Sequence, residues 1–118
     1  MTPHGLRQAD YLSHMLEAAI LAQSYVEGLG KANFLGDKRT QQAVILNIMV
    51  IGEAATKLAD EYPEFVSRFP QVEWKSMRGM RNRLAHGYFD INLDIVWETV
   101  KQALPELENK LRQIQQSL

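Results

Sequence analysis

Apolar residues recur every three or four positions through most of the chain, the spacing that places them on one face of an α-helix. The pattern predicts a first helix from about Leu6 to Leu29 and a second from about Lys38 to Glu61. Gly28 and Gly30 are expected to end the first helix. Asp37, a residue type that accepts hydrogen bonds from free backbone N–H groups, is expected to cap the second.

The connecting stretches carry weaker patterns. Residues Lys31–Gly36 are expected to form a loop, and Glu64–Val72 an irregular connection with a short turn. A third helix is predicted from Val72 or Glu73 to Ala85. Gly87 follows it as a helix terminator.

A last helix is predicted to start after Asn92, which is a good N-cap residue. Pro105 is expected to kink it, because proline has no N–H and its ring crowds the preceding turn. Its apolar positions alternate in steps of three and four as a heptad seam, which serves either the chain's own bundle or a partner helix. The seam consists of Trp97, Val100, Leu104, Leu107, Leu111, Ile114 and Leu118. The pattern as a whole predicts an all-α protein, a four- to five-helix up-and-down bundle forming one domain over residues 1–118.

Composition narrows the class of protein. Hydrophobic residues make up 46% of the 118 residues, as in a folded globular domain, and the formal net charge of −1 argues against bulk electrostatic coating of nucleic acid. The absence of cysteine excludes disulfides and thiolate chemistry. No signal peptide is recognised at the N-terminus, and the apolar run Ala43–Gly52 is too short to span a bilayer. We therefore expect a cytoplasmic protein with no membrane partner.

One short stretch concentrates positive charge. Arg78, Arg81, Arg83 and His86 lie within nine residues, and no acidic residue occurs between Glu73 and Asp90. Guanidinium groups suit phosphate oxygens, and imidazole exchanges protons near neutral pH. Two interpretations stay open: a site for phosphate-ester chemistry, or solvated helix residues followed by a C-terminal capping histidine.

The other two histidines are expected to be ordinary. His14 falls within the first helix as a surface residue, and His4 in a frayed terminus. Gly52 and Glu53 interrupt the apolar pattern of the second helix. They indicate either a close helix–helix contact with Glu53 pointing outward, or a carboxylate that reaches inward to orient an arginine of the basic stretch.

Residues 81–88 read Arg-Asn-Arg-Leu-Ala-His-Gly-Tyr. This resembles the Arg-x-x-x-x-His-x-Tyr motif of the HEPN superfamily. The flanking sequence resembles the HepT-like branch, and the resemblance covers most of the chain. The flanking segments are Ile51–Ala55, Trp74–Arg78, Gly87–Ile91 and Val96–Trp97.

The resemblance implies a helical homodimer with paired motifs in a cleft, acting as a metal-independent endoribonuclease toxin. It implies that Arg81 and His86 are catalytic, with Arg81 stabilising the phosphoryl group and His86 as general base on the ribose 2′-hydroxyl. Asn82 and Glu53 would support them. No metal or cofactor is implied.

The resemblance further implies a partner, a minimal nucleotidyltransferase antitoxin that transfers AMP to Tyr88. Arg78 and Arg83 are candidates for binding the RNA backbone. An alternative function is a non-catalytic nucleotide-binding or regulatory subunit of a nucleotidyltransferase, and a further one is a helical interaction module in which the motif is structural.

Overall fold

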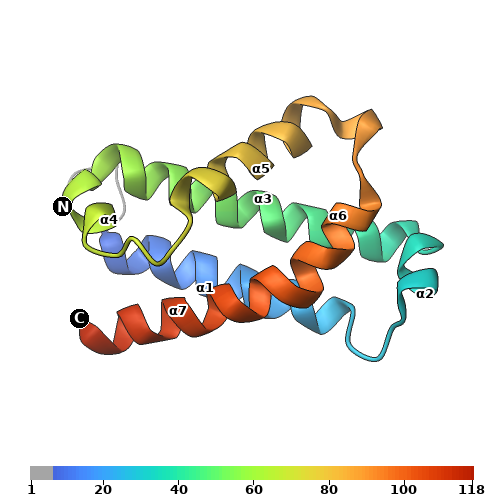
Figure 1. Cartoon of the computed structure of the whole chain (residues 1–118), viewed down its shortest axis with the longest axis horizontal. Helices are drawn as coiled ribbons and strands as arrows, with labels where there is room; N and C mark the ends of the chain where they lie inside the picture. The colour runs from blue at the N-terminus through green and yellow to red at the C-terminus, as the bar shows by residue number, and fades with distance from the viewer. Residues whose placement is uncertain (1–6) are drawn as a thin grey trace.

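Helix α3 packs against α1 on one side and against α5 on the other (Figure 1). The computed structural model describes residues 7–118, in which every regular element is helical. The long segments are α1 (Gln8–Tyr25), α3 (Lys38–Glu61), α5 (Trp74–His86) and the continuous run of α6 (Leu93–Glu98), η2 (Thr99–Ala103) and α7 (Leu104–Ser117). Short elements lie between them: α2 (Lys31–Leu35), α4 (Pro63–Ser67) and the 3₁₀ turn η1 (Tyr88–Asp90). The prediction of an all-α bundle is confirmed.

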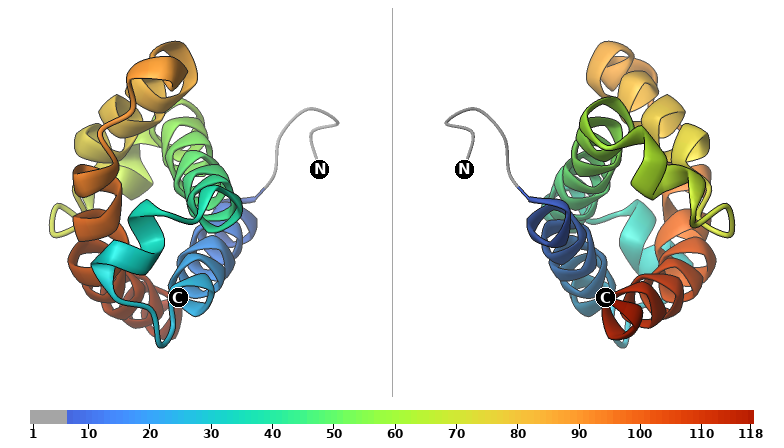
Figure 2. Two further views of the ribbon diagram at one scale, coloured as in Figure 1. Left: turned by 90° about the vertical axis from the view of Figure 1, so that its right-hand side faces the viewer. Right: turned by 90° about the vertical axis from the view of Figure 1, so that its left-hand side faces the viewer.

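Viewed along its long axis, the bundle is a ring in the order α5, α3, α1, α7 (Figure 2). Apolar side chains fill the ring, and no polar or charged side chain is buried in the described residues. The heptad seam serves this core, because four of its members are buried in it. These are Val100, Leu104, Leu111 and Ile114.

Helix α3 has the bounds that the sequence predicts, Lys38–Glu61. The Asp37 carboxylate accepts hydrogen bonds from the Thr40 hydroxyl and the Thr40 N–H, which together lower the pKa of Asp37 below its ordinary value of 3.8. By length and composition α3 could also cross a membrane, but half of the relevant window is buried inside the bundle, as in the core helix of a globular protein.

The predicted end of the first helix needs correction. Helix α1 ends at Tyr25, four residues early, because Val26 and Glu27 close turns onto Gln23 and Ser24 instead of continuing the helical ladder. Val26 is nevertheless buried, so the apolar pattern in the sequence continues beyond the end of the helix. The start expected at Leu6, like His4, lies outside the described residues. His14 is exposed, as expected.

The predicted loop Lys31–Gly36 contains helix α2 instead. Phe34 is fully buried there, with its ring centroid 5.3 Å from that of Trp97, and this tertiary contact holds a helix too short to be stable alone. The connection after α3 likewise contains the short helix α4, which begins with Pro63 at a position that tolerates proline.

The C-terminal helix begins at Asn92, whose side chain accepts from the Asp94 and Ile95 N–H groups, as predicted. Pro105 is accompanied by a change in the hydrogen bonding of the turn that precedes it. The turn before it, η2, is a π-helix, in which the Leu104 N–H donates to the Thr99 carbonyl. Widening this turn is a local way to accommodate a proline that can neither donate a hydrogen bond nor fit a regular turn.

Candidate active site

The basic stretch lies on α5, and α5 is seated on α3 at Gly52. A Cβ built on Gly52 would lie only 2.8 Å from the Met77 carbonyl oxygen and would overlap the Cβ of Arg81. Only glycine therefore permits this approach of the two helices. The first interpretation of Gly52, a close helix–helix contact, is confirmed.

The same contact brings Arg81 beside Glu53. The Arg81 Nε lies 3.7 Å from Glu53 Oε2, with the arginine side chain 25% exposed and the glutamate 53% exposed. Glu53 is thus largely in solvent and still faces the arginine, so its position combines features of both interpretations. We find that the helix contact and the ion pair are consequences of one crossing point.

Arg81 is incompletely satisfied. Its Nε is buried and has no hydrogen-bond partner within the described residues, because 3.7 Å is too long for a hydrogen bond to Glu53. A buried donor left unpaired costs about 1–3 kcal/mol. The ion pair with the half-exposed Glu53 carboxylate therefore leaves the Nε donor of Arg81 without a hydrogen bond.

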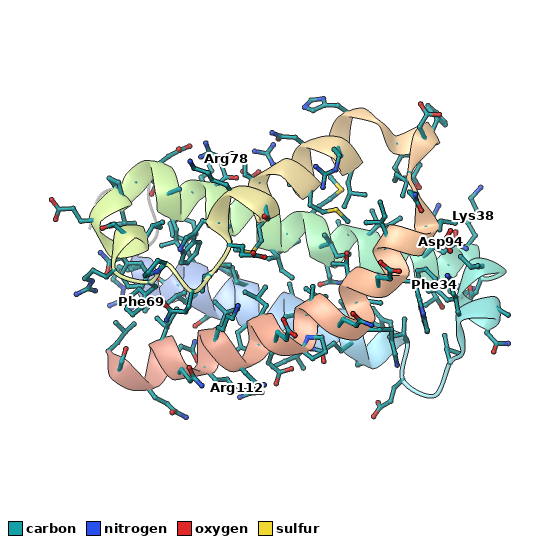
Figure 3. The ribbon with its side chains drawn as sticks, in the orientation of Figure 1. Phe34, Lys38, Phe69, Arg78, Asp94 and Arg112 are labelled. Carbon is teal, nitrogen blue, oxygen red and sulfur yellow. The ribbon has the colours of Figure 1, made fainter. Side chains whose placement is uncertain are left out.

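Arg78 is directed back to α3. Figure 3 labels Arg78 on α5. The Arg78 Nη2 donates to Asp60 Oδ1 at 2.6 Å and lies 3.5 Å from the Thr56 carbonyl oxygen. Arg78 therefore forms a second polar connection between α5 and α3, one turn of helix before Arg81. This occupation weakens the case for Arg78 as a contact to RNA, although a phosphate could still compete with the exposed Asp60.

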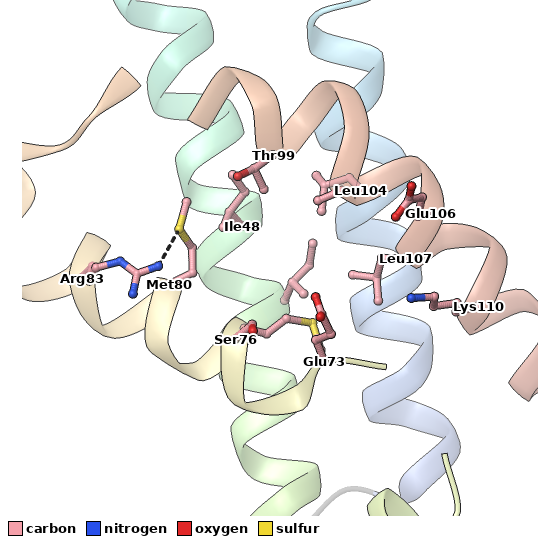
Figure 4. Close-up of a pocket in the computed structure, with 13 residues that line it drawn as sticks. Ile48, Glu73, Ser76, Met80, Arg83, Thr99, Leu104, Glu106, Leu107 and Lys110 are labelled. Atoms are coloured by element: carbon pink, nitrogen blue, oxygen red, sulfur yellow. Dashed lines mark hydrogen bonds between the residues drawn. The ribbon is translucent and has the colours of Figure 1, made fainter. Parts of the chain in front are cut away.

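Arg83 takes a third direction. It is exposed, and its Nη2 lies 3.6 Å from Met80 Sδ at the edge of a pocket between α5 and the η2–α7 run (Figure 4). No carboxylate of the described residues forms an ion pair with it. Asn82, the next residue back, is exposed, and no hydrogen bond joins it to Arg81.

His86 is the last residue of α5 and is exposed. The Gly87 N–H donates to the Arg83 carbonyl at 2.9 Å and ends the helix where the sequence predicts. Tyr88 follows in η1, 45% exposed, and its hydroxyl accepts a hydrogen bond from Gln42 Nε2 at 3.3 Å. The hydroxyl oxygen of Tyr88 is therefore close to the surface and is hydrogen-bonded to α3.

One chain does not bring Arg81 and His86 into a shared pocket among those found in the described residues. The pocket of about 250 Å³ between α5 and α7 is lined by Met77, Met80 and Arg83, and another at the end of α5 is lined by Arg83 and Gly87. Neither Arg81 nor His86 lines any of these pockets. Arg81 leans on α3, whereas His86 projects from the helix end. Five residues along an α-helix correspond to about 7.5 Å of rise and about 140° of rotation, so this divergence follows from helix geometry.

Two residues that hold side chains of the candidate site were not predicted from the sequence. Gln42 and Asp60 hold Tyr88 and Arg78 from a helix 46 and 18 residues away, and no local pattern announces such pairs. Phe89, beside Tyr88, is almost fully exposed. Its signal was available, since an aromatic pair follows directly on a basic stretch. In the described residues, no group of three or more His, Asp or Glu side chains is placed to hold a metal ion.

Comparison with known proteins identifies the family. Residues 15–114 match the family model described as Ribonuclease HepT-like. A probable ribonuclease HepT of Thermococcus cleftensis is 33% identical over 89% of this chain and 93% of its own. A protein of Caldanaerobacter subterraneus subsp. tengcongensis, provisionally named an RNase, is 36% identical over 90% and 92%. Another of Methanocaldococcus jannaschii is 42% identical over 70% and 64%.

No solved structure matches this chain. The family model nevertheless covers the whole of α3 and α5, the two helices that carry Glu53, Arg81 and His86. The Thermococcus and Caldanaerobacter relatives match over nearly their full lengths, so the likeness to these two is that of whole proteins. The chain therefore belongs to the HepT-like ribonuclease family and is a ribonuclease.

Proposed function

We propose that the chain is a metal-independent endoribonuclease, the toxin of a toxin–antitoxin pair, acting in the cytoplasm with Arg81 and His86 as its catalytic residues. The observation that carries the proposal is the seating of Arg81. The Arg81 side chain, 25% exposed, is held beside Glu53 at a helix crossing that only glycine permits, about one and a half turns before an exposed imidazole. The fixed cation and the reachable base are what phosphodiester cleavage needs.

In the proposed reaction, His86 removes the proton from a ribose 2′-hydroxyl, and the 2′-oxygen attacks the adjacent phosphorus. The bond from phosphorus to the 5′-oxygen breaks, and that oxygen takes a proton from water. The products are a 2′,3′-cyclic phosphate and a 5′-hydroxyl. Arg81 stabilises the charge that grows on the phosphoryl oxygens, with Asn82 and Glu53 orienting it. DNA is not cut, because it lacks the nucleophile.

The site is completed by a second copy of the chain. The outward face of α3 beside the crossing carries Leu46, 61% exposed and two turns before Glu53, and Val50, 38% exposed and one turn before it. Covering this strip in a two-fold pair brings two copies of the motif together, so that Arg81 of one copy and His86 of the other face one phosphodiester. The divergence of the two side chains within one chain supports this arrangement.

Silencing acts on Tyr88. Its exposed hydroxyl attacks the α-phosphorus of ATP held by a minimal nucleotidyltransferase antitoxin, and pyrophosphate leaves. The resulting tyrosyl-AMP places an anionic group two residues from His86, where it occupies the substrate phosphate site. The Gln42 hydrogen bond keeps the hydroxyl at the surface of α3 before transfer.

The catalytic assignment is tested by RNA cleavage in EDTA. His86→Ala should lose about 10²–10⁴-fold in rate while still binding RNA, because a general base is removed and the cations remain. His14→Ala, an exposed histidine on α1, is the matched control and should cut at the parental rate. Equal cleavage by parental protein and His86→Ala would instead favour a nucleotide-binding subunit without catalysis.

The two-chain site is tested by mixing inactive variants. Arg81→Ala and His86→Ala are each expected to be inactive alone. If the site takes one residue from each copy, random pairing of the two restores about a quarter of parental activity, because half of the pairs hold one intact site of two. No recovery after exchange of subunits would place both residues in one chain's site.

A further inference from the structure

The most exposed large apolar side chain of the described residues is Phe89. Its ring is 98% exposed, whereas the next, Leu46, is 61% exposed. It stands on η1, at the outer corner of the molecule between α5 and α6 (Figure 1). An aromatic ring with almost no contact to its own chain contributes nothing to the core, and nearly all of its surface is free to contact a ligand.

The ring is held in place by its neighbour. The centroids of Tyr88 and Phe89 are 6.0 Å apart with an interplanar angle of 79°, an edge-to-face pair. Tyr88 is tied in turn to Gln42 on α3, and the Asp90 N–H donates to the Gly87 carbonyl at 2.9 Å to close the turn. Phe89 thus lies on a short turn that is held by hydrogen bonds, and its exposed ring surface is available for stacking.

The charges around this turn favour a nucleic-acid base over a protein surface. Arg78 and Arg81 are paired with carboxylates of α3, but Arg83 and His86, the residues nearest the turn, have no ion-pair partner in the described part of the chain. Asp90, on the same turn as Phe89, lines a hollow together with Arg83 and Asn92, but among the described residues no ion pair joins Asp90 to Arg83. A fixed aromatic ring bordered by unpaired basic groups is how proteins bind unpaired bases of single strands.

We propose that Phe89 is a stacking platform for an unpaired nucleobase next to the phosphodiester that is cut. The inference rests on the proposed function, because it takes the bound strand to be the RNA substrate. It adds a requirement that the Arg–His pair alone does not impose, namely that the RNA be single-stranded beside the cut. Arg83 lies three residues before His86 on the same helix and neutralises a flanking phosphate.

The test is RNA binding measured without cleavage, in His86→Ala protein. Phe89→Ala should weaken binding of a single-stranded RNA at least about tenfold, the usual scale of one lost base–aromatic stack. Phe89→Trp should bind as well as the parent. Phe89→Leu, equally apolar but without a π-face, should bind as weakly as Phe89→Ala. Binding of the same sequence as a duplex should not change among the variants.

Two controls make the result interpretable. Leu35→Ala removes another exposed apolar side chain, on α2, and should leave binding unchanged. The oligomeric state of each variant is measured by light scattering. If Phe89→Ala converts a dimer to a monomer, Phe89 is a contact between copies. If Phe89→Leu binds RNA normally, the aromatic face is not needed for binding. Either result overturns the inference.

The proposed function and this inference fail in different ways. Normal, Phe89-dependent binding by a parental protein that cuts no RNA overturns the reaction but leaves the platform. Normal cleavage with binding unchanged in Phe89→Ala overturns the platform but leaves the reaction. Absence of any RNA binding overturns both.

Discussion

Replacing Gly52 with alanine tests the idea that one crossing point positions Arg81, the arginine of the proposed catalytic pair. The added methyl group would lie 2.8 Å from the Met77 carbonyl oxygen and would overlap the Arg81 Cβ. Neither neighbour is the flexible end of a side chain. Relief therefore requires α5 to move away from α3, and Arg81 moves with it.

The magnitude follows from a matched comparison with Gly79→Ala on α5. Alanine is favoured over glycine within a helix by about 1 kcal/mol, and this gain applies to both variants. A Cβ on Gly79 meets only the Arg83 Nη1, at an ordinary 3.5 Å. The difference between the variants is therefore the steric penalty alone, about 1–3 kcal/mol for overpacking, and the backbone contacts favour the upper part of that range.

Thermal unfolding measures this difference. For 118 residues, the entropy of unfolding is about 0.25 kcal/mol/K, so 1 kcal/mol corresponds to about 4 °C in Tm. Gly79→Ala should melt about 4 °C above the parent, and Gly52→Ala about 4–12 °C below Gly79→Ala. Cleavage should fall in Gly52→Ala only. A Gly52→Ala protein that melts with Gly79→Ala, or cuts RNA at the parental rate, would refute the reasoning.

Three further predictions concern polar groups. Glu53→Gln should lower kcat while shifting Tm by no more than about 4 °C, because a half-exposed ion pair contributes at most about 1 kcal/mol; an unchanged kcat would remove its orienting role. Asn92→Ala should destabilise the chain by about 1 kcal/mol in urea unfolding, through loss of the bonds to the Asp94 and Ile95 N–H groups. Asp37→Asn should be less stable than the parent at pH 6, because the folded-state pKa of Asp37 lies below its unfolded value of 3.8. The difference in stability should shrink as the pH falls below 3.8 and disappear once the folded-state carboxylate is protonated. A difference that persists at low pH would show that charge is not the cause.

Local signals were sufficient wherever the neighbours that decide a structure are close in sequence. The caps Asp37 and Asn92 and the stop at Gly87 act on residues within a turn, so the corresponding helix ends were predictable. Helix α2 was not predictable in this way. Phe34 is buried by Trp97, 63 positions later, and no pattern within Lys31–Leu35 contains that information.

The same distinction applies to the candidate site. The motif places Arg81 and His86 on one helix, but it does not say which arginine is free. Arg78 and Arg81 find carboxylates on α3, whereas Arg83 does not, and this division depends on the orientation of α5 about its axis. Orientation is decided at Gly52, which the sequence marked only as an interruption of an apolar pattern.

The contacts that hold α5 explain why Gly52 is important for the candidate site. Helix α5 packs mainly on α3, and a pocket separates it from the η2–α7 run on its other side. Besides its buried side chains Trp74 and Leu84, α5 is positioned on α3 by three contacts. These are the Gly52 approach, the Arg78–Asp60 bond and the Arg81–Glu53 pair. Two of these contacts involve arginines of the basic stretch itself. Because both guanidinium groups also hold α5 against α3, we expect an anion that draws either one away from its carboxylate to weaken the seat of α5 and so to shift His86.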